Sequence, residues 1–319
     1  MWRSCYLYLL VLGTTPVLNA QNSALFSLMD ATTKTNERFG FISLSEIYDT
    51  GEQPDSLIIP GLQDPQQDNL QCIELDGMFR KKFLSATKIS ETDQVYVYDY
   101  ATDKLLVFPV KQLRVFTYLT VYMHTEDCPC SSNDYMIGFK IAHELLEGLG
   151  PYYSTVLVAV GEENPFVHGQ MKAIVWTKIN SADFPSSKAS VKIRKQSPGS
   201  SKGDAYSYES GDFRFYIQDI LDANNSQVIK RNLLIVDKKT GEVIIESIFV
   251  NSEGTSLAPL NFGIADDDGI IQTEQWTGKL LKNEPEVFFG FEWVSFGCPG
   301  IQFIDAAKKS FSIKCDNRH

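Results

Sequence analysis

The chain has 319 residues, a formal net charge of −11 and a sequence pI near 4.9. A hydrophobic content of 43% and an aromatic content of 12% are enough for packed cores, which excludes a disordered chain. The acidic balance leaves no basic surface to release phosphate counterions, so we expect no nucleic-acid partner.

Residues 1–20 have the pattern of a secretory signal peptide. Arg3 supplies a short basic region, an apolar run follows over 6–12, and Ala20 is a small residue at a suitable cleavage position. The apolar run is shorter than the roughly 20 residues that a membrane-spanning helix needs. No later segment is long and apolar enough to span a bilayer either, so we expect a secreted, extracellular protein without a membrane span.

Residues 21–178 are predicted to form an α/β-type domain. Two runs of alternating and β-branched residues, 94–100 and 105–110, flank a four-residue connection and predict a β-hairpin. The next run, 114–123, is rich in β-branched and aromatic residues and predicts a buried strand.

A helix is predicted over residues 133–149, because apolar side chains recur there at intervals of four. These side chains are Ile137, Ile141, Leu145 and Leu149. Since a strand-like run over 154–161 follows, residues 114–160 read as strand, helix and strand, which predicts parallel pairing through a right-handed crossover.

The rest of the chain is predicted to contain a polar connection and a second domain. Residues 179–212 are rich in glycine and serine and are interpreted as an exposed loop or linker. Residues 213–319 are interpreted as a β-rich domain, in which 231–237 and 242–250 flank a Lys-Lys-Thr-Gly turn and predict a hairpin. We therefore predict an α+β fold, a mixed sheet with at least one strand–helix–strand crossover, followed by a β-rich C-terminal part.

The cysteines indicate a disulfide framework with an odd member. Cleavage after residue 20 would remove Cys5 and leave five: Cys72, Cys128, Cys130, Cys298 and Cys315. Cysteines in an oxidising compartment usually pair. We expect Cys298 to bond Cys315 across a terminal hairpin, and Cys72 to bond Cys128 or Cys130. The remaining cysteine is then free or forms an inter-chain disulfide.

The Cys128-Pro129-Cys130 segment has two chemical alternatives to structural pairing. His124, Cys128 and Cys130 offer three zinc-ligand types within seven residues, and make up the candidate metal site. A redox pair is the other alternative, although such pairs normally have two residues between the cysteines. We assign no catalytic residue and no cofactor.

Residues 114–160 also resemble the strand–Pro-Cys–helix–strand segment of the cytidine-deaminase-like fold. In that family, Pro-Cys-x-x-Cys opens a helix and supplies two zinc thiolates, and an upstream His-x-Glu or Cys-x-Glu supplies a third ligand and a glutamate. Pro129 and Cys130 match the start of the motif, Asn133 stands where the second cysteine belongs, and 72–74 reads Cys-Ile-Glu. With that ligand lost, the resemblance implies an inactive relative.

Asn224-Asn225-Ser226 is an acceptor pattern for N-glycosylation, and we expect Asn224 to lie on the surface. Together these features predict a secreted, disulfide-stabilised glycoprotein with a non-catalytic binding, matrix or structural role. Its expected partners are extracellular proteins or matrix components. The alternative is a secreted zinc-dependent enzyme of deaminase-like fold centred on Cys130.

Overall fold

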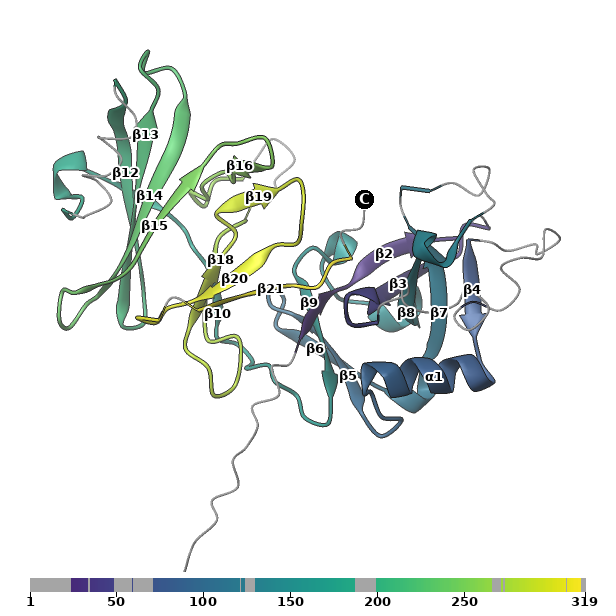
Figure 1. The fold of residues 1–319 in the computed structure, drawn as a ribbon. Coiled ribbons are helices and arrows are strands. Elements are labelled where there is room, and N and C mark those ends of the chain that lie inside the picture. The colour runs from purple at the N-terminus through teal and green to yellow at the C-terminus, as the bar shows by residue number, and fades with distance from the viewer. Residues whose placement is uncertain are drawn as a thin grey trace, which may run out of the picture.

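The computed structural model describes residues 24–33, 35–48, 59, 71–120, 122–123, 130–186, 199–265, 271, 273–307 and 309–316. Within these residues, strands β1 to β21 form five sheets, and α1 (Gly77–Thr87) is the single α-helix (Figure 1). Every pairing between these strands is antiparallel. The predicted α+β fold with a parallel crossover is therefore wrong, because the described chain is predominantly β.

Two sheets and α1 make up the N-terminal unit, residues 24–161. The first sheet has the order β2 (Met29–Thr32), β3 (Arg38–Ser43), β8 (Tyr135–Ala142), β7 (Arg114–Leu119) and β4 (Cys72–Leu75). The second has the order β1 (Leu25–Ser27), β9 (Val156–Gly161), β5 (Gln94–Asp99) and β6 (Lys104–Pro109). Apolar side chains from both sheets and from α1 share one buried core, which holds the unit together.

The predicted helix over 133–149 is instead strand β8, followed by 3-10 turns at His143–Leu146 and Pro151–Tyr153. A spacing of four is also a multiple of the strand period of two, so Ile137 and Ile141 share a face in either structure. Tyr135 and Phe139 complete that face, and all four of these side chains are buried.

A second observation explains why residues 135–142 form a strand. A Cβ atom at Gly138 would lie 1.8 Å from the carbonyl oxygen of Ile42, so glycine allows β3 to lie directly against β8. Leu145, which the helix would have placed in the core, is 57% exposed. Strand β7 pairs with β8, whereas β9 belongs to the other sheet, so the segment 114–160 contains no crossover.

Three further sheets form the C-terminal unit, residues 171–312. One has the order β11 (Thr177–Ile179), β12 (Ser201–Ser210), β13 (Phe213–Leu221), β14 (Val228–Asp237) and β15 (Val243–Val250). Another has the order β10 (Met171–Ala173), β17 (Trp276–Gly278), β18 (Val287–Phe289), β20 (Gly300–Phe303) and β21 (Ser310–Ser312). The third is a ribbon of β16 (Thr255–Leu257) and β19 (Glu292–Val294).

Local turn and alternation signals predicted the hairpins correctly. Strands β5 and β6 pair as expected from 94–100 and 105–110, and β14 and β15 pair as expected from 231–237 and 242–250. The interpretation of 179–212 as a loop or linker is wrong for residues 201–210, which form β12 inside a five-stranded sheet.

The two units share a further apolar core at the seam between them. Tyr98 and Leu157 of the N-terminal unit pack with Trp276, Val287 and Ile301 of the C-terminal unit. After β21 the chain returns to the N-terminal unit, where residue 314 pairs with β1 (Figure 1). No helix among the described residues combines the length and the apolar character needed to cross a membrane.

Candidate functional site

Of the two disulfides that the sequence suggested, the structure contains Cys298–Cys315 but no bond to Cys72. Cys72 is free and 5% exposed, so the expected bond from Cys72 to Cys128 or Cys130 is wrong. Its side chain lies on the face of β4 opposite the main core, where it packs with Phe39, Phe41 and other apolar residues. Burial raises the pKa of the thiol to about 11. A thiol in this position is unreactive and out of reach of another chain, which removes Cys72 as a source of an inter-chain disulfide.

The candidate zinc site loses a ligand. Cys130 is disulfide-bonded, and its partner is not one of the other described cysteines, because Cys298 and Cys315 bond each other. A sulfur in a disulfide is not a thiolate and does not bind zinc as one. The other two residues of that candidate site, His124 and Cys128, lie outside the described residues.

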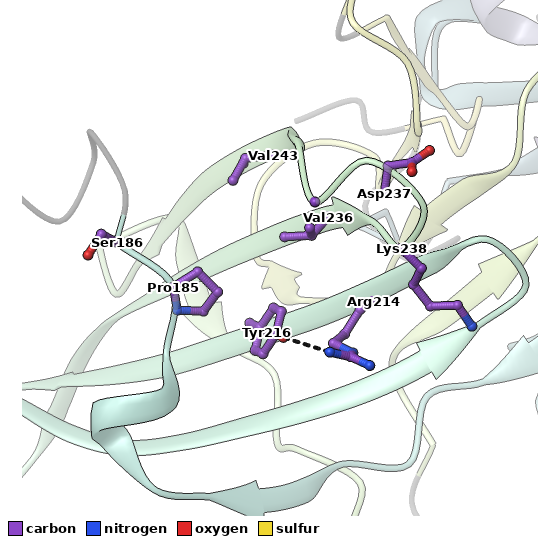
Figure 2. A pocket seen from close by; sticks show the side chains of 9 residues that line it. Pro185, Ser186, Arg214, Tyr216, Val236, Asp237, Lys238 and Val243 are labelled. Carbon is purple, nitrogen blue, oxygen red and sulfur yellow. Dashed lines mark hydrogen bonds between the residues drawn. The ribbon is translucent and has the colours of Figure 1, made fainter.

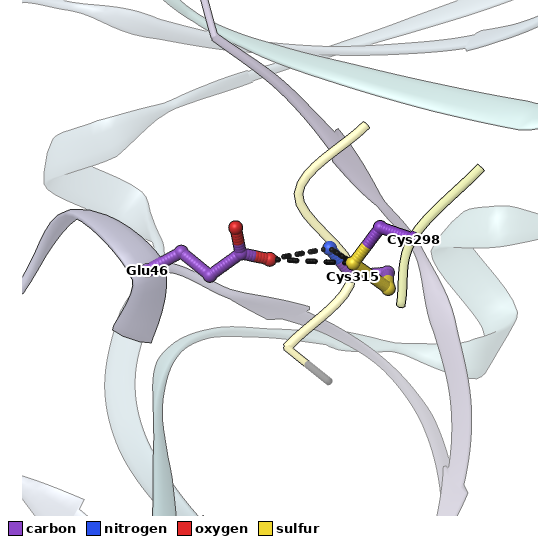
Figure 3. Close-up of side chains that lie close together, drawn as sticks. All are labelled: Glu46, Cys298 and Cys315. Atoms are coloured by element: carbon purple, nitrogen blue, oxygen red, sulfur yellow. Dashed lines mark hydrogen bonds between the residues drawn. A yellow bond between two sulfur atoms is a disulfide. The ribbon is translucent and has the colours of Figure 1, made fainter. Parts of the chain in front are cut away.

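The Cys298–Cys315 disulfide belongs to a connection between the two ends of the chain (Figure 3). Glu46 accepts hydrogen bonds from the backbone N–H groups of Cys315 at 2.8 Å and Asp316 at 3.0 Å. Its other oxygen lies 3.1 Å from Nζ of Lys314. We call Glu46, Cys298, Lys314 and Cys315 the C-terminal latch. A carboxylate oxygen of Glu46 and the two sulfurs lie within 4.8 Å of one another, close enough to share a metal ion. The bonded sulfurs are not thiolates, however, so this is a structural connection.

A hollow of about 350 Å³ lies on the sheet formed by β11 to β15 in the C-terminal unit (Figure 2). Arg214 and Lys238 line it, but Arg214 Nε donates to Glu209 at 2.6 Å and Lys238 Nζ lies 3.4 Å from the same carboxylate. Asp237 accepts hydrogen bonds from backbone N–H groups of the turn that follows it. Because these charges are satisfied by the protein, the hollow offers little to hold a ligand.

The described histidines stabilise loops. His143 Nδ1 lies 2.7 Å from the hydroxyl of Tyr153. His168 lies 3.5 Å from Asp103, whose carboxylate also accepts hydrogen bonds from Tyr98 and the backbone of Gly169. These bonds lower the pKa of Asp103, the backbone bond from Gly169 most of all. Neither histidine contacts a serine or cysteine nucleophile in the described structure, and both are used for positioning.

The most distinctive surface lies on the β16–β19 ribbon. Trp293 is 49% exposed, Val294 38% and Phe296 60%, and Val250 at the end of β15 is also exposed. We call these four residues the ribbon surface. The Trp293 indole N–H donates to Glu274 at 3.0 Å, which fixes the ring although half of it faces solvent. Such a fixed, exposed aromatic group is typical of a contact site, because little side-chain entropy is lost on binding.

The surroundings of the ribbon surface are acidic. The sequence has no lysine or arginine from 251 to 278 or from 283 to 307. Glu253, Glu274 and Glu292 lie on or beside the ribbon. Partial burial raises the pKa of Glu292, and the hydrogen bond from the backbone N–H of Val250 opposes this effect. The site therefore combines apolar contact area with negative charge.

The β-rich pattern of the C-terminal part does not by itself point to this surface, although the sequence contains a signal for it. The absence of cations around Trp293 distinguishes the segment from an ordinary surface strand, where lysine commonly discourages pairing. Asn224, the predicted glycosylation position, lies exposed in the turn between β13 and β14. Comparisons with protein-family models, with curated proteins and with solved structures find no match.

Proposed function

We propose that this protein is a secreted, non-catalytic extracellular binding protein that contacts its partner through the ribbon surface. The observation that carries this proposal is that Trp293, Val294 and Phe296 are all largely exposed within one short, acidic segment of the ribbon. Exposed apolar side chains that lie close together lower the solubility of a protein. Where a protein keeps them, they commonly mark a binding site.

Three further features support an extracellular role. The first twenty residues have the leader pattern, the Cys298–Cys315 disulfide suits an oxidising compartment, and Asn224 is exposed. The zinc-enzyme alternative has less support, because Cys130 is bonded and residues 135–142 form a strand instead of the helix that the deaminase-like segment requires.

The compartment is tested by expressing the full chain in a eukaryotic cell line. We expect a shortened chain in the medium, whose mass falls after enzymatic removal of N-glycans. The Asn224→Gln variant should be secreted without that mass change. Retention of the intact chain inside the cell would contradict the proposal.

The contact surface is tested by retention of the purified protein on an immobilised extracellular-matrix extract. We expect the Trp293→Ser/Phe296→Ser variant to lose most of its retention. A control variant, Ile47→Ser/Val107→Ser, removes exposed apolar side chains elsewhere and should retain binding. Equal retention of both variants would show that the ribbon surface is not the contact surface.

A further inference from the structure

Strand β19 has an open backbone edge. The backbone N–H of Ser295 donates to Gly254 at 2.9 Å, and that of Ala258 donates to Phe291 at 3.1 Å. With the register of Trp293 opposite Ser256, these bonds place the backbone groups of Glu292 and Val294 on the side of β19 facing away from β16. Within the described chain no hydrogen bond reaches those N–H or C=O groups.

Among the described residues, the β19 edge has few of the features that normally prevent strand pairing. Proteins protect open edges by short length, charged side chains, proline, a bulge or a covering segment, and β19 has only its short length and Glu292. β6, another edge strand, begins at Lys104 and ends at Pro109. β19 consists of Glu292, Trp293 and Val294, and the chain remains exposed through Gly297. A weakly protected edge with exposed apolar side chains suits the addition of a strand from outside.

The charge of the ribbon restricts the added strand. The two lysines nearest in sequence are already engaged: Lys279 donates to the carbonyl of Glu284, and Lys282 to that of Asn164 at 2.7 Å. Across the sheet, the cations nearest the ribbon are Lys230, opposite Val250, and Arg231, which is paired with Asp219. Glu253, Glu274 and Glu292 outnumber them, so an incoming segment meets an excess of negative charge. A second copy of this chain would bring six such carboxylates together in a molecule of net charge −11, which disfavours self-pairing.

We propose that the β19 edge binds an extended segment of a partner protein in which apolar residues alternate with lysine or arginine. This inference rests on the proposed binding function and specifies the partner's chemistry. The backbone of the partner pairs with Glu292 and Val294. One face of its strand contacts Trp293, and the cations on its other face approach Glu292.

Fluorescence anisotropy with a labelled eight-residue peptide of alternating valine and lysine tests this inference. Controls are a valine–glutamate peptide and a valine–lysine peptide with alternate backbone nitrogens methylated, which removes half of the hydrogen-bond donors and leaves the protein unchanged. We expect the valine–lysine peptide to bind, both controls to bind at least about tenfold more weakly, and added salt to weaken binding.

Variants of the protein locate the site. Val294→Lys adds a cation to the edge, and Val294→Pro removes an N–H that faces outward. Each should weaken binding of the valine–lysine peptide by at least about tenfold. Val107→Lys makes the same change at a valine that is 46% exposed on the β6 edge, and should leave binding within about twofold. Thermal unfolding checks that each variant is folded.

Two results would overturn the inference. Equal binding of the methylated and unmethylated peptides would mean that charge alone attracts the peptide without strand addition. Failure of the valine–lysine peptide to bind the folded wild-type protein would mean that the edge does not accept a basic strand. In either case, loss of matrix retention by Trp293→Ser/Phe296→Ser would leave the proposed binding function standing.

Discussion

Strands β1 and β19 are both three residues long and both lie at the edge of a sheet, but only β1 is closed. The backbone of Lys314 accepts a hydrogen bond from Ser27 and donates one to Leu25, at 2.9 and 2.7 Å. Leu25 and Phe26 are buried, whereas Trp293 and Val294 of β19 are exposed. The chain thus satisfies one edge with its own C-terminal residues and leaves the other available, which is why we place binding at β19.

The closed edge depends on contacts that are distant in sequence. The C-terminal latch joins Glu46 of the N-terminal unit to Cys315 and the residues beside it. The disulfide to Cys298 ties the same segment to the C-terminal unit. The open edge has no equivalent support among the described residues, so perturbations of the latch should affect β1 and spare β19.

Removal of the disulfide should have the largest effect on stability. Cys298 and Cys315 are 17 residues apart, and a loop of this size is worth about 3 kcal/mol in the chain-entropy model. We expect Cys298→Ser/Cys315→Ser to lower the free energy of unfolding in urea by about that amount, and to leave peptide binding at β19 unchanged. A loss of peptide binding in the folded variant would show that the two edges are coupled.

Glu46→Ala should have the next largest effect. The change removes the carboxylate that accepts from the backbone N–H groups of Cys315 and Asp316 and pairs with Lys314, and only Cys315 keeps a second acceptor, Cys298 Sγ at 3.2 Å. This should cost about 2 kcal/mol of unfolding free energy. Glu74→Ala is the matched control, because Glu74 makes one exposed ion pair with Arg114, at 3.3 Å, and should cost less than about 0.5 kcal/mol. Similar losses in both variants would contradict the role of Glu46.

Proline substitution compares the two edges directly. Ser27→Pro removes an N–H that bonds Lys314, and should lower the unfolding free energy by about 1 kcal/mol or more. Val294→Pro removes an N–H that faces outward, and should cost less than about 0.5 kcal/mol. Urea denaturation of both variants measures the difference. A larger decrease in unfolding free energy for Val294→Pro would mean that the Val294 N–H is already hydrogen-bonded within the protein.

The pH dependence of peptide binding should be the smallest effect. Because the pKa of Glu292 is raised in the folded protein, this group favours folding in acid, and that contribution is lost as the pH rises through the raised pKa. A cationic peptide favours the carboxylate, so its affinity should increase across the same pH interval. Glu292→Gln should reduce the increase, although Glu253 and Glu274 also contribute charge.

Local patterns predicted the two hairpins, because a turn and the alternation of its flanking strands are close in sequence. A spacing of four fits the periods of both helix and strand, so the pattern over 133–149 does not distinguish them; the pairing of β8 with β3 and β7 does. The serine- and glycine-rich composition of 201–210 concealed β12. The open edge was not predictable locally, since it depends on which strands remain unpaired after the whole chain has folded.

Hydrogen exchange at the Val294 amide tests the open edge most directly. In the free protein we expect Val294 to exchange rapidly while the amides of Ser27 and Lys314 are protected, and we expect Val294 to become protected when the valine–lysine peptide binds. Protection of Val294 in the free protein, or rapid exchange that persists with the peptide bound, would contradict an edge that accepts a strand.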